Sequence, residues 1–177
     1  MERITKATLE EFLRRLGRRV SPGSILYLLG GSALCLLGSP RTTVDIDYTV
    51  EPFEGIPETF EVVVAEVAAT MDLDVEAVPI AEFVPLPPGA RDRGQLVGRY
   101  GRLTAYIFDP YTIALSKIAR GFEADLEDVM FMLRRGIIDF KALEGHFRAV
   151  LPDAPRADVI PAEFNRYFEE VKRRFAG

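Results

Sequence analysis

The sequence predicts a mixed α/β fold (α+β) in which a β-sheet is flanked by helices and followed by a helical C-terminal part. Up to residue 109, short apolar or alternating segments typical of strands are interspersed with segments of helical periodicity. From residue 110 onward the periodicity is helical throughout. Strands that alternate with helices favour a sheet of mixed direction. At 177 residues the chain suits a single domain, with an α/β core over 1–109 and a helical part over 110–177.

Local signals divide the first half of the chain into helices and strands. The residues Thr8-Leu-Glu-Glu11 have the pattern of a capping box, which opens a helix. Polar and apolar residues that alternate indicate strands, whereas apolar residues three or four apart indicate helices. We therefore expect a helix over 8–20, a turn over 21–24, a buried strand over 24–29, a short helix over 32–37, a strand over 44–50, a helix over 57–70 and a strand over 73–78.

The second half begins with a segment, 81–94, whose proline, glycine and arginine content predicts a loop. Residues 95–109 predict a hairpin that turns near Gly101, with one face carrying Leu103, Ala105 and Ile107. Prolines at 152 and 155 mark 151–159 as a linker. Helices are expected over 110–120, 124–135, 140–150 and 161–176.

Composition excludes several classes of protein. A net charge of −5 and a pI near 5.1 argue against a surface built as a whole for nucleic acid. One cysteine, Cys35, and one histidine, His146, exclude an internal disulfide and make a structural zinc site implausible. The N-terminus lacks the apolar core of a signal peptide, and no apolar run reaches the ~20 residues that span a bilayer. We expect a soluble, cytoplasmic protein that does not interact with membranes.

The segment from Leu29 to Tyr48 contains the residues that point to chemistry. Gly30 and Gly31 stand between the predicted strand and the short helix, where they allow a sharp turn and leave room for a ligand. The backbone N–H groups after this turn and the hydroxyl of Ser32 favour an anion such as phosphate. A plain strand-to-helix turn is the alternative interpretation of the two glycines.

Asp45 and Asp47 follow on the predicted strand over 44–50, where residues two apart face the same side. At ~4 Å and an effective dielectric constant of ~20, two carboxylates repel by about 4 kcal/mol. Such a pair indicates a shared proton, a basic partner or a divalent cation. Mg²⁺ prefers oxygen ligands of this kind. The alternative is a pair of surface acids on an edge strand, where charge discourages aggregation.

Gly30-Gly31-Ser32 and the run Thr43-Val-Asp-Ile-Asp47 together resemble the signature of the nucleotidyltransferase superfamily. The spacing is near that of the CCA-adding and poly(A) polymerase branch. The Arg41 and threonines before the acids look more like small nucleotidyltransferase-like proteins related to abortive-infection and toxin–antitoxin nucleotidyltransferases. Lys117-Ile-Ala-Arg120 followed by Asp125-Leu-Glu-Asp128 is similar to a helical segment of that branch.

The resemblance implies the nucleotidyltransferase fold and transfer of a nucleoside monophosphate from an NTP to a hydroxyl of RNA, protein or a small molecule. It further implies a two-metal site with Mg²⁺ as cofactor. Asp45 and Asp47 would hold the metal ions, with a third carboxylate from a neighbouring strand. We expect Asp74 in that place, with Glu76 and Asp72 as alternatives on the same predicted strand face.

Nucleotide binding would involve Gly30, Gly31, Ser32, Arg41, Thr43 and Lys117. Arg41 either donates to the triphosphate or pairs with Asp45. Lys117 either extends out of the core or reaches a phosphate. Asp125 and Asp128 fall on one helix face and are expected to position Lys117 or Arg120 rather than to bind metal.

Other residues of interest have weaker roles. Arg91 and Arg93 are expected in a mobile, solvated loop, with a substrate contact as the alternative. Cys35 is expected to be buried and inert, and His146 to be a surface or packing residue. A second hypothesis for the whole chain is a non-catalytic partner protein, for example an antitoxin-like component that keeps the fold and binds a nucleotide without turnover.

Overall fold

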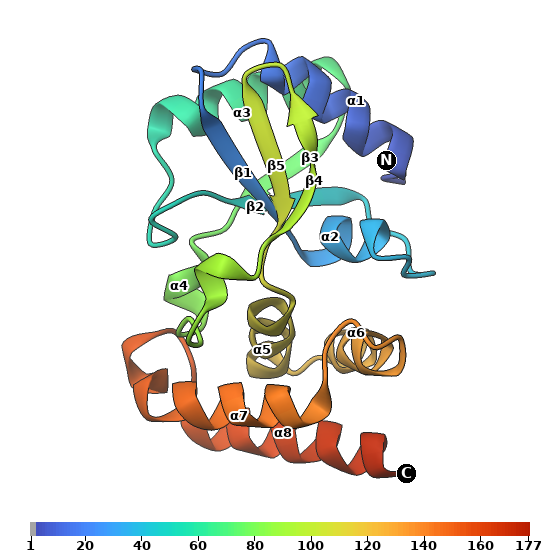
Figure 1. The fold of residues 1–177 in the computed structure, drawn as a ribbon, viewed down its shortest axis with the longest axis vertical. Coiled ribbons are helices and arrows are strands. Elements are labelled where there is room, and N and C mark those ends of the chain that lie inside the picture. Colours follow the sequence, from blue (N-terminus) through green and yellow to red (C-terminus); the bar gives the residue numbers. More distant parts are fainter. Residues whose placement is uncertain (1–2) are drawn as a thin grey trace. The chain divides into compact units, whose positions relative to one another are not determined.

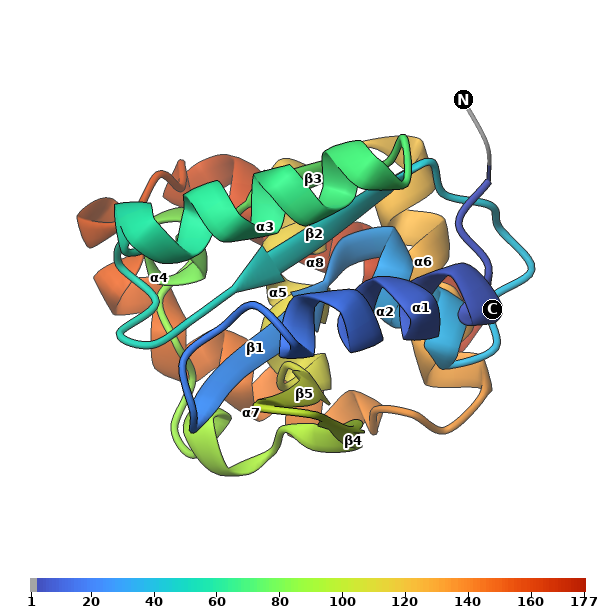
Figure 2. The ribbon, with the colours of Figure 1, turned by 90° about the horizontal axis from the view of Figure 1, so that it is seen from above.

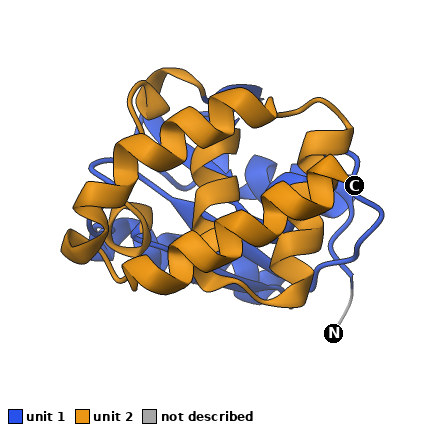
Figure 3. Ribbon diagram, turned by 90° about the horizontal axis from the view of Figure 1, so that it is seen from below, with its two compact units in different colours: residues 1–79, 94–108 blue, residues 80–93, 109–177 orange. Residues whose placement is uncertain are grey.

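The computed structural model describes residues 3–177, and these divide into two compact units (Figures 1 and 3). The first unit comprises residues 3–79 and 94–108, drawn blue in Figure 3. The second comprises residues 80–93 and 109–177, drawn orange. The break after Phe108 lies beside the division expected at residue 109, whereas residues 80–93 group with the C-terminal helices.

The first unit is built on a five-stranded mixed sheet in the order β3-β2-β1-β5-β4. β1 pairs antiparallel with β2 and parallel with β5, while β2 and β3 are parallel and β4 and β5 form the expected hairpin. Gly101, at the hairpin turn, has a φ of +60°, which glycine adopts without strain. The strands are β1 Ser24–Leu29, β2 Asp45–Thr49, β3 Asp74–Ala77, β4 Gln95–Tyr100 and β5 Leu103–Ile107. The predicted mixed sheet is confirmed.

Two helices, α1 Lys6–Gly17 and α3 Glu58–Thr70, lie over the same face of this sheet (Figure 2). The predicted start of α1 at Thr8 is wrong, because the side chain of Thr5 caps the helix by accepting the Thr8 N–H at 3.1 Å. The helix also ends at Gly17 rather than at Val20. A Cβ on Gly17 would lie 1.7 Å from the Tyr100 carbonyl oxygen, so the helix ends where its backbone packs on the hairpin.

Successive side chains of β2 point to opposite faces of the sheet. Ile46 and Tyr48 are buried, and the ring of Tyr48 lies 6.1 Å from that of Phe60 on α3. Burial, with a contribution from the charge of Glu61, raises the pKa of Tyr48. Asp45, Asp47 and Thr49 therefore face away from the helical layer.

The second unit contains four long helices and three short helical segments. Their bounds are α4 Ile80–Phe83, η1 Ala90–Asp92, α5 Pro110–Arg120, α6 Glu123–Arg134, α7 Phe140–Val150, η2 Leu151–Arg156 and α8 Pro161–Ala176. The predicted bounds of α5, α7 and α8 are confirmed to the residue. The expected loop over 81–94 instead contains α4 and η1, and the expected linker over 151–159 instead contains the 3-10 helix η2.

Long-range contacts explain why these two segments are ordered. The Asp158 N–H donates to the Glu82 carbonyl at 2.8 Å, which ties the two segments together. Arg93 donates from Nε and Nη2 to the two carboxylate oxygens of Asp109, at 2.8 and 2.9 Å. The expectation that Arg93 is solvated and mobile is therefore wrong. These hydrogen bonds to Asp109 raise the pKa of Arg93.

Asp109 also caps α5, since its side chain accepts the N–H groups of Tyr111 and Thr112. An Asp-Pro pair before a helical pattern is a sequence signal for such a cap, and it could have identified Asp109. Among residues 3–177, no helix has both the length and the apolar character needed to cross a membrane.

Candidate functional site

Three carboxylates from β2 and β3 come together on the sheet of the first unit. Asp45 and Asp47 project from the same face of β2, and the parallel register places Asp47 beside Glu76. One carboxylate oxygen from each of Asp45, Asp47 and Glu76 lies within 4.8 Å of the other two. Asp45 and Asp47 are half-buried, whereas Glu76 is exposed.

The third member of this acidic cluster is Glu76, which the sequence offered as an alternative to Asp74. Asp74 lies in register beside Asp45 and is exposed, but it is not one of the three acids that converge. Asp72 precedes β3 and has a φ of +53°. The longer side chain of glutamate, on the strand position next to Asp47, gives a physical reason for the convergence.

The two glycines lie directly against residues of the β2 segment. Gly30 has a φ of +55°, and a Cβ there would lie 2.3 Å from Asp47 Oδ2. A Cβ on Gly31 would lie 2.7 Å from both Cβ and Oγ1 of Thr43. The absence of a side chain thus lets the backbone of Gly30 approach Asp47, and that of Gly31 approach Thr43, more closely than any other residue would permit. The short helix α2, Gly30–Leu36, begins at these glycines rather than at Ser32.

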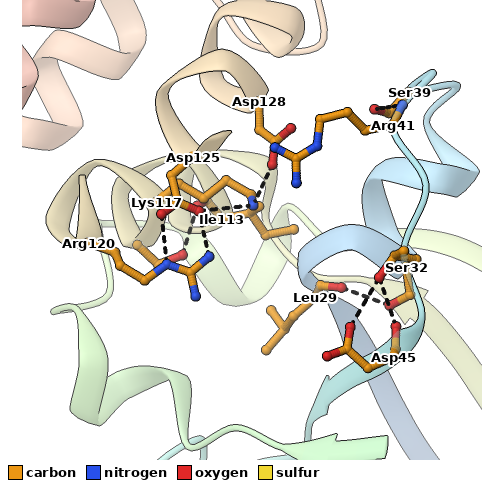
Figure 4. A network of polar contacts seen from close by, with 12 residues as sticks. Leu29, Ser32, Ser39, Arg41, Asp45, Ile113, Lys117, Arg120, Asp125 and Asp128 are labelled. Carbon is orange, nitrogen blue, oxygen red and sulfur yellow. Dashed lines mark hydrogen bonds and ion pairs between the residues drawn. The ribbon is translucent and has the colours of Figure 1, made fainter. Parts of the chain in front are cut away.

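Three other residues expected at the site are in the same unit. Ser32 is buried, and its hydroxyl donates to the Leu29 carbonyl at 2.8 Å (Figure 4). The hydroxyl of Thr43 donates toward Asp45, 3.1 Å from Oδ1 and 3.2 Å from the main-chain oxygen. Arg41 is exposed, and its backbone N–H donates to Ser39 Oγ at 3.2 Å.

Lys117 belongs to the second unit, where a different acidic pair surrounds it (Figure 4). Its Nζ donates to Asp128 Oδ2 at 2.9 Å and lies 3.8 Å from Asp125 Oδ1. Arg120 donates to both carboxylate oxygens of Asp125, at 2.7 and 2.5 Å. Lys117, Asp125 and Asp128 are all buried. The expected contacts of these aspartates with Lys117 and Arg120 are therefore present.

The acidic cluster of the first unit fits a divalent cation by its chemistry. Its donors are carboxylate oxygens, which are the ligands that Mg²⁺ takes from proteins. Asp45, Asp47 and Glu76 gather three like charges within 4.8 Å, and a bound cation would offset their repulsion. A metal ion held here would lie beside the backbone of Gly30, because that residue contacts Asp47.

A mixed sheet flanked by helices, with paired aspartates on one strand beside a glycine turn, is consistent with an α+β protein of the nucleotidyltransferase-like class. The chain belongs to the family described as nucleotidyltransferase of unknown function (DUF6036), whose model matches residues 7–175. No curated protein and no solved structure matches the chain. The predicted likeness to nucleotidyltransferases is thereby confirmed at the level of the family.

Proposed function

We propose that this protein is a Mg²⁺-dependent nucleotidyltransferase that moves a nucleoside monophosphate from an NTP to a hydroxyl acceptor on RNA, protein or a small molecule. The family supports the class of reaction. The observation that carries the proposal is the convergence of three carboxylate oxygens within 4.8 Å beside a glycine turn. The proposal places the site on the sheet of the first unit.

Asp45, Asp47 and Glu76 are the residues that would hold the metal ions. When bound, such ions stabilise the attacking and leaving oxygens of an in-line displacement. The acceptor oxygen forms a bond to the α-phosphorus, the bond from that phosphorus to the bridging oxygen breaks, and pyrophosphate leaves. We propose that Glu76, the exposed acid, accepts the proton of the attacking hydroxyl. Asp74 stands beside the cluster and is proposed to have no direct part.

The nucleotide's phosphates would approach the backbone N–H groups at Gly30 and Gly31, at the start of α2, where Gly30 already lies against the acid Asp47. Ser32 contributes through its backbone, since its hydroxyl already donates to Leu29. Arg41 remains the proposed cationic ligand of the phosphates. Lys117, which the sequence suggested as a further ligand, lies in the second unit and donates to Asp128 there, so we propose no phosphate contact for it.

Labelled NTPs, Mg²⁺ and a cell lysate provide the direct test. We expect label to be transferred to RNA, protein or a small molecule. Asp45→Asn, Asp47→Asn and Glu76→Gln should abolish transfer, while Asp74→Asn, the matched change at the neighbouring register position, should retain it. Absence of transfer by the unmodified protein, or full transfer by Asp45→Asn, would contradict the proposal. If Asp74→Asn lost transfer and Glu76→Gln retained it, Asp74 rather than Glu76 would be the third acid of the site.

The second candidate is an antitoxin-like partner that binds a nucleotide without turnover. Two observations favour it: the third acid is exposed, and Lys117 already pairs with two buried aspartates. Thermal unfolding with each NTP, with and without Mg²⁺, separates the candidates. A nucleotide at about 100 times its Kd should add ~2.7 kcal/mol of stability. Stabilisation without transfer to any acceptor would favour the partner protein.

A further inference from the structure

We propose that Thr43 is a positioning residue that orients the carboxylate of Asp45 for metal binding, rather than a residue that contacts the nucleotide. This inference rests on the proposed metal site at Asp45, Asp47 and Glu76. It assigns a specific task to a hydroxyl that the sequence pattern associates only with the nucleotide.

The first step is the hydrogen bond itself. Thr43 Oγ1 lies 3.1 Å from Asp45 Oδ1, and Asp45 is one of the three acids whose oxygens converge. The hydroxyl also lies 3.2 Å from the main-chain oxygen of Asp45, so it holds the carboxylate close to its own backbone and restrains its rotation. Hydrogen bonds from neighbouring residues hold metal-ligating carboxylates in this manner, and their loss typically lowers metal affinity by about 10- to 100-fold.

The second step is the way in which Thr43 is itself held. A Cβ on Gly31 would lie 2.7 Å from Thr43 Cβ and Oγ1, so the threonine side chain packs against the bare glycine backbone. Threonine branches at Cβ, which restricts its χ1 angle. The carbonyl of Thr43 accepts the N–H of Ile4 at 2.8 Å, and Ile4 is buried. Side chain and backbone of Thr43 are therefore both fixed.

The third step is what this arrangement does to the acidic cluster. Asp45, Asp47 and Glu76 repel one another when no cation is bound, and repulsion favours rotation of their side chains away from the centre. The hydroxyl of Thr43 opposes that rotation for Asp45. Thr43 also touches Gly31, so one residue links the glycine turn to a metal ligand.

The test is a titration of the full-length protein with Mn²⁺, followed by electron paramagnetic resonance, in the absence of any nucleotide. Thr43→Val removes the hydroxyl and keeps the branched shape, and we expect it to weaken Mn²⁺ binding by about 10- to 100-fold. Thr43→Ser keeps the hydroxyl and should restore affinity. Thr42→Val, the same change at the exposed neighbouring threonine, is the matched control and should bind Mn²⁺ as the unmodified protein does.

The outcomes separate this inference from the proposed function. If the unmodified protein binds no Mn²⁺, the metal site and the proposed function fail together. If it binds Mn²⁺ and Thr43→Val binds equally well, only the role of Thr43 is overturned. If Thr43→Val and Thr43→Ser lost Mn²⁺ affinity equally, packing rather than the hydroxyl would be the cause. That result would also overturn the proposed role of Thr43. Should Thr43→Val not fold, Thr43→Ala compared with Thr43→Ser answers the same question.

Discussion

The two units each contain a cluster of aspartates, and the clusters differ in what surrounds the acids. In the first unit, Asp45 and Asp47 converge with a further acid, Glu76. In the second, Asp125 and Asp128 meet the basic side chains of Lys117 and Arg120. The first cluster gathers three like charges within 4.8 Å, whereas the second pairs two negative with two positive charges.

The difference indicates that the two clusters have different tasks. Acids that meet basic side chains of their own unit form a network that joins helices, here α5 and α6. Acids that converge on one another raise the free energy of the folded protein unless a cation binds. In each place two aspartates share one face of their element, two residues apart on β2 and three apart on α6. The neighbouring residues therefore separate the structural network from the proposed metal site.

The largest expected effect comes from one substitution in the second cluster, Asp128→Asn. This change removes the carboxylate that accepts from the buried ammonium of Lys117. Asp125, whose Oδ1 lies 3.8 Å from Lys117 Nζ, then remains as its acidic neighbour. Because removal of one partner from a buried ion pair typically costs about 3–5 kcal/mol, we expect a loss of about 3 kcal/mol in the free energy of unfolding. Urea denaturation followed by circular dichroism measures it.

Two variants show whether charge is the cause. Combining Lys117→Met with Asp128→Leu removes both charges and should recover most of the stability. Asp45→Asn makes the same change in the first cluster, where it removes a like charge and leaves an amide oxygen that can accept the Thr43 hydrogen bond. We expect stability there to be unchanged or to rise by up to about 1 kcal/mol. A large loss in Asp45→Asn would make the two clusters alike and refute the comparison.

Gly30→Ala is expected to have the next largest effect, because it acts on both backbone and site. A φ of +55° costs a residue with a Cβ roughly 1–2 kcal/mol, and the new methyl would lie 2.3 Å from Asp47 Oδ2. We expect a loss of about 2 kcal/mol in stability and weaker Mn²⁺ binding, since the Asp47 carboxylate must rotate away.

Gly145→Ala is the matched control for this change. Gly145 lies within α7, and a Cβ there meets nothing within 4 Å. Alanine in a helix interior should stabilise the protein by about 0.5–1 kcal/mol, which is the opposite sign. Urea denaturation gives both values. If the two alanine variants had similar stability and similar Mn²⁺ affinity, the close approach of Gly30 to Asp47 would have no functional meaning.

The sequence predicted most elements because their signals are local. The apolar run of β1 and the Pro-initiated helices α5 and α8 match their predicted bounds. Contacts between distant residues were not predictable in this way. The bond from Asp158 to Glu82 and the pair formed by Arg93 and Asp109 bring segments 80–93 and 151–159 into the second unit, and nothing in the local pattern of either segment specifies its partner.

The candidate site shows the same division between local and distant information. The shared face of Asp45 and Asp47 follows from strand periodicity, and the closeness of Asp47 to Gly30 follows from the antiparallel pairing of the consecutive strands β1 and β2, which places Asp47 opposite Leu29. The choice of Glu76 over Asp74 depends on the register of β3 against β2 and on the reach of each side chain. Both acids lie on the same strand face, so periodicity alone leaves the choice open.

The smallest expected effect concerns His146, a titratable group of the second unit whose ring lies tilted against that of Tyr111, with ring centroids 4.9 Å apart. Burial lowers the pKa of His146, and the charge of Arg93 lowers it further, while Asp109 opposes the shift. The unfolded chain, with a histidine pKa near 6.5, therefore binds a proton more readily than the folded protein. As the pH falls through 6.5 toward the lowered value, the free energy of unfolding should decrease.

His146→Gln should remove this component of the pH dependence, because glutamine does not titrate. The measurement is a comparison of urea midpoints for the unmodified protein and the variant, above and below pH 6.5. We expect the urea midpoints of the two proteins to differ more in acid than in neutral solution, because the unmodified protein should lose more stability on acidification. The pair formed by Arg93 and Asp109 compensates its own charges, as the network at Lys117 does, so a protonated His146 would add an uncompensated positive charge to this region. An identical pH dependence in both proteins would show that this region accommodates that charge without cost.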